Sequence, residues 1–129
     1  MQKKIIYVFG SLLLDFDSLP LMLIKDLQAV FPQIDFQIID PNENLKPIDK
    51  KMVIIDTVEG IDKVTIITDI DQLVLTQLYS PHDFDLGFNL QLLKKLGLLD
   101  EILIFGVPME IKKQTAFEQL VLVMRQYYL

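Results

Sequence analysis

The sequence predicts an α/β domain, a three-layer α/β/α sandwich with a mostly parallel sheet. Short runs of β-branched and aromatic residues alternate along the chain with segments whose apolar residues recur at helical spacing. Such alternation is typical of strands joined by crossover helices, which cover both faces of a parallel sheet. With 129 residues, of which 51% are hydrophobic, the chain is long enough to bury a sizeable core. We therefore expect a single domain over residues 1–129.

Five segments are expected to be strands, because they are short, rich in β-branched and aromatic residues, and bounded by turn-forming residues. They are residues 4–10, 36–39, 52–55, 64–68 and 101–105. Only residues 56–63 separate the third strand from the fourth, which is too few for the crossover helix between parallel neighbours. The fourth strand, residues 64–68, is therefore expected to run antiparallel to the others.

Three segments are expected to be helices: residues 19–31, residues 85–96, and a C-terminal helix that starts at the capping box Thr115 to Glu118. Each has one apolar stripe. The stripes are Leu23, Leu27, Val30 and Phe31 in the first, Leu86, Leu90, Leu93 and Leu96 in the second, and Phe117, Leu120, Val121 and Met124 in the third. Ser18 is the expected N-cap of the first helix, Pro32 its stop, and Gly97 the stop of the second.

Charge and composition exclude several classes of function. A net charge of -6 works against nucleic acid or anionic lipid as a partner, because both require a basic surface. The chain has no cysteine, so disulfides, thiolate metal sites and a cysteine nucleophile are excluded. The apolar run at residues 5–9 is too short for a signal peptide or a membrane span. We expect a cytoplasmic monomer that binds neither nucleic acid nor membrane.

Ligands of open α/β sheets collect outside the carboxyl ends of the strands, which directs attention to the loops after residues 10, 55 and 68. The candidates there are Asp17, Asp56 and His82. Each has an ordinary explanation by itself: Asp17 or its neighbour Ser18 caps a helix, Asp56 caps a loop, and a lone surface histidine is usually incidental. Together, two carboxylates and one imidazole suit a divalent ion such as Ni²⁺ or Zn²⁺, provided that their loops meet at one edge.

At these positions the sequence resembles the hydrogenase maturation endopeptidases. This family removes the C-terminal extension from the large subunit of nickel-iron hydrogenases after nickel has been inserted. The resemblance runs over nearly the whole chain and depends on four segments, residues 10–20 (GSLLLDFDSLP), 55–57 (IDT), 80–86 (SPHDFDL) and 104–108 (IFGVP). In the first segment, Asp15 and Phe16 stand where the family has a glycine and its first aspartate.

The resemblance implies a five-stranded sheet with one antiparallel strand, as in phosphorylase/hydrolase-like folds. It also implies that Asp17, Asp56 and His82 are the catalytic and metal-binding residues. The metal would be nickel carried by the substrate, the hydrogenase large-subunit precursor, so no permanent cofactor is expected.

Two other functions remain open from the residues themselves. A non-catalytic α/β module could capture a metal or small ligand at the same edge of the sheet. Nucleotide binding is disfavoured, because the first strand is followed by neither a G-x-G-x-x-G nor a Walker pattern.

Overall fold

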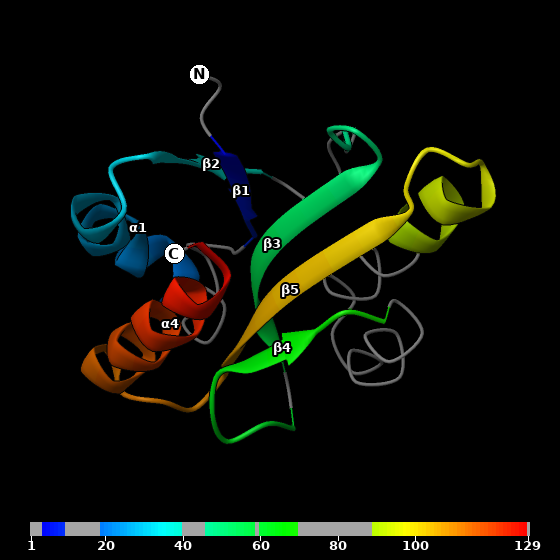
Figure 1. Cartoon of the computed structure of the whole chain (residues 1–129). Helices are drawn as coiled ribbons and strands as arrows, with labels where there is room; N and C mark the ends of the chain where they lie inside the picture. The colour runs from blue at the N-terminus through cyan, green and yellow to red at the C-terminus, as the bar shows by residue number, and fades with distance from the viewer. Residues whose placement is uncertain (1–3, 10–18, 40–45, 59, 70–88, 129) are drawn as a thin grey trace.

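The computed structural model describes residues 4–9, 19–39, 46–58, 60–69 and 89–128, with the backbone alone for residues 19–22 and 128. Their elements follow one another as strands β1 (Lys4–Val8), β2 (Ile34–Ile38), β3 (Lys51–Val58), β4 (Thr65–Ile67) and β5 (Glu101–Pro108), with helices α1 (Leu19–Val30) and α4 (Lys113–Tyr128). Residues 89–95 are also helical. Figure 1 shows the twisted sheet running through the molecule, with helices on both sides.

The five strands form one sheet in the order β2-β1-β3-β5-β4. β1 pairs in parallel with β2 and β3, and β3 pairs in parallel with β5 along eight residues of each strand. β4 alone runs antiparallel, beside residues 104–106 of β5. The expected α/β fold, with a mostly parallel five-stranded sheet and one antiparallel strand, is confirmed.

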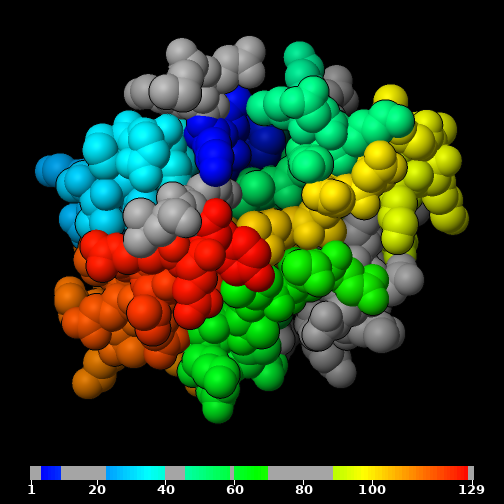
Figure 2. Space-filling model, viewed as in Figure 1, coloured from blue at the N-terminus to red at the C-terminus, as the bar shows by residue number. Residues whose placement is uncertain are grey.

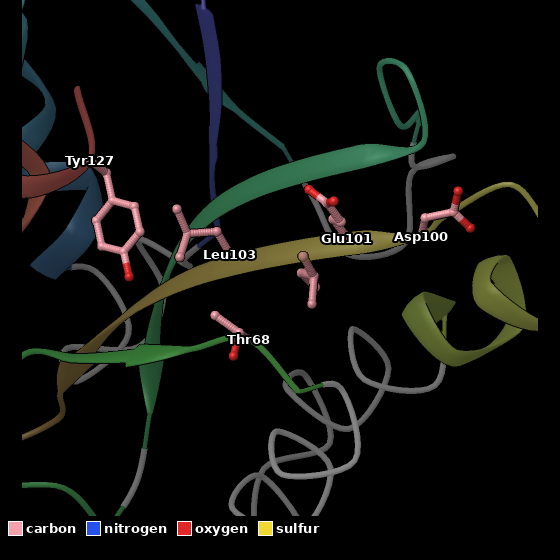
Figure 3. A pocket seen from close by; sticks show the side chains of 6 residues that line it. Thr68, Asp100, Glu101, Leu103 and Tyr127 are labelled. Carbon is pink, nitrogen blue, oxygen red and sulfur yellow. The ribbon is translucent and has the colours of Figure 1, made fainter. Parts of the chain in front are cut away.

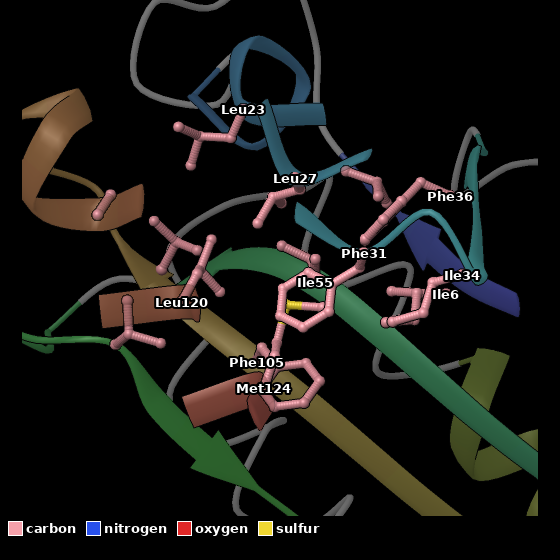
Figure 4. Close-up of a cluster of buried hydrophobic side chains, with 14 residues drawn as sticks. Ile6, Leu23, Leu27, Phe31, Ile34, Phe36, Ile55, Phe105, Leu120 and Met124 are labelled. Atoms are coloured by element: carbon pink, nitrogen blue, oxygen red, sulfur yellow. The ribbon is translucent and has the colours of Figure 1, made fainter. Parts of the chain in front are cut away.

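Each face of the sheet buries its own apolar cluster. On one face α1 and α4 pack through Leu23, Leu27, Leu120 and Met124 onto side chains such as Ile55 (Figure 4). On the other face Leu90, from helical residues 89–95, belongs to a cluster with strand residues such as Ile54 and Ile104. The alternation of Ile54 and Ile55 between the two clusters is the strand period of two, and it makes the fold three-layered.

Two strands are longer than the sequence indicates. β3 continues to Val58 and β5 continues to Pro108. The two strands remain paired in register over this stretch, through Asp56↔Gly106, Thr57↔Val107 and Val58↔Pro108. The sequence indicates strand ends at residues 55 and 105 because the polar residues Asp56 and Thr57 follow the first and Gly106 follows the second. Pairing between two central strands overrides the low strand preference of those residues.

Helix ends differ from expectation at two places. Lys112 O accepts the Ala116 N–H at 2.9 Å, so α4 begins before Thr115, and the expected capping box lies inside the helix. Leu96, expected on a buried stripe, is 62% exposed. The reason is the turn that follows: Gly97 has φ +75°, and the Leu98 N–H returns to Leu93 O at 3.0 Å. Leu99, rather than Leu96, re-enters the core.

None of the helices within the described ranges is long and apolar enough to cross a membrane.

Candidate functional site

The sheet order places a topological switch point between β1 and β3. From β1 the chain proceeds outward to β2 on one side, while β3 lies on the other side of β1. In open α/β sheets the crevice at the carboxyl ends of two such strands is the usual ligand site. The carboxyl end of β3 carries Asp56 and Thr57.

Asp56, the candidate ligand at the carboxyl end of β3, is fully buried. It shares the face of Ile54 and Val58 because β3 continues past it. Its Oδ1 accepts the backbone N–H of Thr57 at 2.9 Å. A buried carboxylate that is held this way is oriented by the fold, because its hydrogen bond fixes the side chain.

Asp56 and its hydrogen bond to Thr57 lie at the point where β1 and β3 separate. The pairing of β1 with β3 reaches Val8↔Ile55, and the Phe9 N–H donates to Ile55 O at 3.0 Å. Thr57 lies two residues further and turns its N–H to the same side as Ile55, because backbone groups alternate along a strand. The Asp56 carboxylate therefore takes a backbone donor at the β1 side of β3, beyond the described pairing with β1.

Thr57 is a feature that the sequence reasoning missed. It is 2% exposed, and its Oγ1 has no hydrogen-bond partner within the described structure. A buried hydroxyl without a partner is uncommon in folded proteins. The signal in the sequence was a hydroxyl directly after a carboxylate at the end of an apolar run, but a threonine in a strand is too ordinary to single out.

Gly106 of β5 lies beside Asp56 in the β3–β5 register. A Cβ at this position would lie 2.9 Å from Val58 Cγ2 and 3.4 Å from Thr65 O, so β3 and β4 close around a residue that must be small. Two of the four segments that carried the family resemblance, residues 55–57 and 104–108, are thus brought side by side.

Asp17 and His82, the other two predicted site residues, lie outside the described residues. Within the described ranges no three Asp, Glu or His side chains are grouped to hold a metal ion. The metal site formed by Asp17, Asp56 and His82 therefore stays a prediction.

Thr68 does not belong to this edge. The loop after it was expected among the ligand loops, but β4 runs antiparallel, so its carboxyl end points away from the carboxyl ends of β3 and β5. The pairs Thr65↔Gly106 and Ile67↔Ile104 show the direction: β4 begins beside the Asp56 region and leaves it. The carboxyl-end rule holds for parallel strands alone.

Comparison with known proteins gives a likeness in structure. No protein-family model matches the sequence, and no curated protein matches it. The chain is similar to an endopeptidase from Escherichia coli known from a solution structure, with a TM-score of 0.59 and 18% sequence identity over 95% of this chain and 93% of that one. At this identity the likeness establishes the fold, which extends over nearly the full length of both chains.

Proposed function

We propose that this protein is an endopeptidase that removes the C-terminal extension of a nickel-iron hydrogenase large-subunit precursor. The observation that carries the proposal is the position of Asp56, a buried, oriented carboxylate at the topological switch point of the sheet. That position is where an open α/β fold binds its ligand. It is also where the sequence resembles the strand-end aspartate of the hydrogenase maturation endopeptidases.

The fold likeness supports the same class. The similar Escherichia coli protein is an endopeptidase, and the match extends over 93% of its chain. The expected cytoplasmic location and the expected monomer belong to this proposal as well, since a protease that matures a cytoplasmic precursor needs neither an anchor nor a second copy in its site.

In the proposed mechanism the chain recognises nickel already held by the precursor. The carboxylates of Asp17 and Asp56 and the imidazole of His82 would supply the oxygen and nitrogen ligands that such an ion accepts. Nickel polarises the groups that it binds. The part of this chain is to position the scissile peptide next to the ion and to hold Asp56 in one orientation through the Thr57 N–H.

The test is processing of the precursor by single variants. Asp56→Asn keeps an oxygen that can accept the Thr57 N–H but removes the negative charge, so it is expected to fold normally and to lose processing. Asp17→Ala and His82→Ala are expected to lose it as well. Asp62→Asn, at an exposed carboxylate in the 60–64 turn, is the matched control and is expected to process as the unmodified protein does.

The outcomes separate the alternatives. A shortened large subunit on a denaturing gel supports the protease, and binding of the nickel-loaded precursor without shortening supports the non-catalytic binding module. If the Asp17, Asp56 and His82 variants all process normally, the assigned site is wrong.

A further inference from the structure

The sheet ends in β4 on one side and in β2 on the other. An edge strand can pair with another chain only where its backbone groups point outward and have no partner. β4 has three residues, and the N–H of Val64, directly before it, donates to Gln119 Oε1 at 2.8 Å. Backbone groups alternate along a strand, so Ile66 is the one residue of β4 that turns the same way as Val64. The β4 edge is therefore closed to an added strand.

β5 extends beyond β4, but it offers no row of partners either. Figure 3 shows Thr68 across from Leu103, where β4 has left β5. The Glu101 N–H donates to Lys50 O at 3.2 Å, and Lys50 lies directly before β3. Glu101 and, by alternation, Leu103 therefore face β3, which leaves Ile102 alone to face the open side.

β2 is different, because part of its outer side is open. The N–H of Ile39, directly after the strand, donates to Val8 O at 3.1 Å, so Ile39 faces β1. The parallel register with β1 is unbroken, so every second residue back from Ile39 faces β1 as well. The residues of β2 that face outward are therefore Ile34, Phe36 and Ile38.

Of these three residues, Ile34 is already occupied. Its N–H donates to Phe31 O at 3.1 Å, and its O accepts Gln28 Nε2 at 2.8 Å. Within the part of the chain that the structure describes, the outward N–H and C=O groups of Phe36 and Ile38 have no hydrogen-bond partner. Figure 2 shows the cyan atoms around β2 at the surface of the molecule. β2 thus offers a row of two donors and two acceptors.

β2 also lacks the features that normally protect an edge strand. Its sequence, IDFQI, contains neither lysine nor proline, and no bulge interrupts its pairing with β1. Ile38 is 63% exposed, whereas Phe36, on the same face of the strand, is buried. The single charged residue of β2 is Asp35, which lies before the open half and accepts Gln37 Nε2 at 2.8 Å.

The open half of β2 is complementary to itself. In an antiparallel pair, two opposite residues that face each other exchange both of their backbone hydrogen bonds. A two-fold arrangement that sets Phe36 opposite Ile38 of a second copy does this twice, and so uses all four groups of each copy. A shift by two residues in one direction meets the occupied groups of Ile34, and a shift in the other direction passes beyond β2.

The side chains that meet in this register are compatible. The exposed Ile38 would pack beside Phe36 of the second copy, because opposite residues share a face. Gln37 would lie opposite Gln37 on the two-fold axis, where an amide can both donate and accept. Asp35 falls opposite Ile39, so no like charges are opposed in spite of the net charge of -6.

We propose that this protein associates with a second copy of itself through antiparallel pairing of β2 with β2, which joins two five-stranded sheets into one. A second copy fits better than a flexible peptide, because its strand is already ordered and four hydrogen bonds need not offset the entropy of ordering it. The contact is smaller than a standard interface, so a dissociation constant of about 10 μM to 1 mM is expected.

The inference is independent of the proposed cleavage. β1 separates β2 from β3, so the second copy lies outside the Asp56 region and takes no part in the candidate site. A weak symmetric dimer takes the place of the monomer that was expected from the sequence.

The test is self-association of the ¹⁵N-labelled chain between about 10 μM and about 1 mM, followed by NMR and by analytical ultracentrifugation. Amide signals of residues 36–38 are expected to shift along one binding curve while the average mass rises toward that of a dimer. Ile38→Pro removes an outward N–H that the sheet of one copy does not use, so it is expected to fold normally and to associate at least about tenfold more weakly. Ile38→Val keeps that N–H and is the matched control, expected to associate within about threefold of the unmodified chain.

Gln37 tests the two-fold axis itself. Gln37→Lys or Gln37→Glu places like charges opposite each other, so either variant alone is expected to associate about two- to fivefold more weakly. A mixture of the two variants opposes Lys to Glu and is expected to associate more tightly than either variant alone. Neither a peptide partner nor another register would give this recovery.

The inference is overturned if the signals of residues 36–38 do not change with concentration, or if the shifts lie elsewhere. Association of Ile38→Pro as tight as that of the unmodified chain would also refute it. Circular dichroism shows whether Ile38→Pro folds, and if it does not, the Gln37 mixture decides: a mixture no tighter than its components refutes the two-fold pairing. Signals of β2 that respond to added precursor but not to protein concentration would assign the edge to another protein and refute the dimer.

Discussion

At the scale of single residues, the position of Asp56 at a strand end was predictable from the sequence, whereas its burial was not. A carboxylate after an apolar run identified the position, and the structure places it at the switch point. Its burial could not be predicted, because the extent of β3 is set by pairing with β5 through Val58↔Pro108, a contact between residues far apart in the chain. Asp17 and His82 stay predictions from the sequence.

Thr57 gives the first prediction at this scale. Thr57→Val replaces a buried, unpartnered hydroxyl by a methyl group of the same shape, so it is expected to raise the free energy of unfolding by about 1 kcal/mol. Urea unfolding followed by circular dichroism measures it. Thr65→Val is the control, because the Thr65 hydroxyl donates to Lys63 O at 2.9 Å and its removal should bring no gain. A loss of stability in Thr57→Val would show that the hydroxyl has a partner.

At the scale of elements, periodicity predicted the helix faces correctly wherever the helix is regular. Leu23 and Leu27 in α1, and Leu120 and Met124 in α4, are all fully buried as their spacing required. Helix ends were less predictable. A T-x-x-E pattern favours an N-cap at Thr115. α4 instead begins at Lys113, and its first backbone hydrogen bond runs from the Ala116 N–H to Lys112 O.

The turn after helical residues 89–95 gives a prediction about an element. Gly97 has φ +75°, and a Cβ there would meet no atom within 4 Å, so the cost of a side chain is backbone strain alone. Gly97→Ala is expected to lower the free energy of unfolding by about 1 kcal/mol. Lys95→Ala, at an exposed position of the same helix, is the control and should change stability by less than about 0.5 kcal/mol. An unchanged midpoint for Gly97→Ala in urea would contradict the turn described here.

At the scale of the whole molecule, the fold class followed from the alternation of strand and helix patterns, and the antiparallel strand from a connection too short for a crossover helix. The order of the strands did not follow. Placing β5 between β3 and β4 requires non-local pairing, which leaves no trace in local spacing. This order decides which carboxyl ends meet, and the antiparallel direction of β4 places its carboxyl end at the opposite edge of the sheet from those of β3 and β5.

The same order predicts how stability is distributed. β3 is central, with β1 on one side and eight paired residues of β5 on the other, whereas β4 is an edge strand of three residues. Amides of Ile54 and Ile55 are expected to exchange with deuterium at the rate of global unfolding, and those of β4 much faster through local opening. Hydrogen exchange followed by NMR measures both. Equal protection of β4 and β3 would contradict the sheet order.

The proposed cleavage is tested most directly by the intact mass of the substrate. A nickel-loaded hydrogenase large-subunit precursor from the same organism is incubated with a catalytic amount of this protein, and the intact mass of the precursor is then measured by mass spectrometry. Cleavage at one position predicts that the nickel-loaded precursor loses one C-terminal segment of fixed mass, and recognition through nickel predicts that a nickel-free precursor stays whole. A nickel-loaded precursor of unchanged mass, with a protein that folds and binds it, would contradict the proposed endopeptidase.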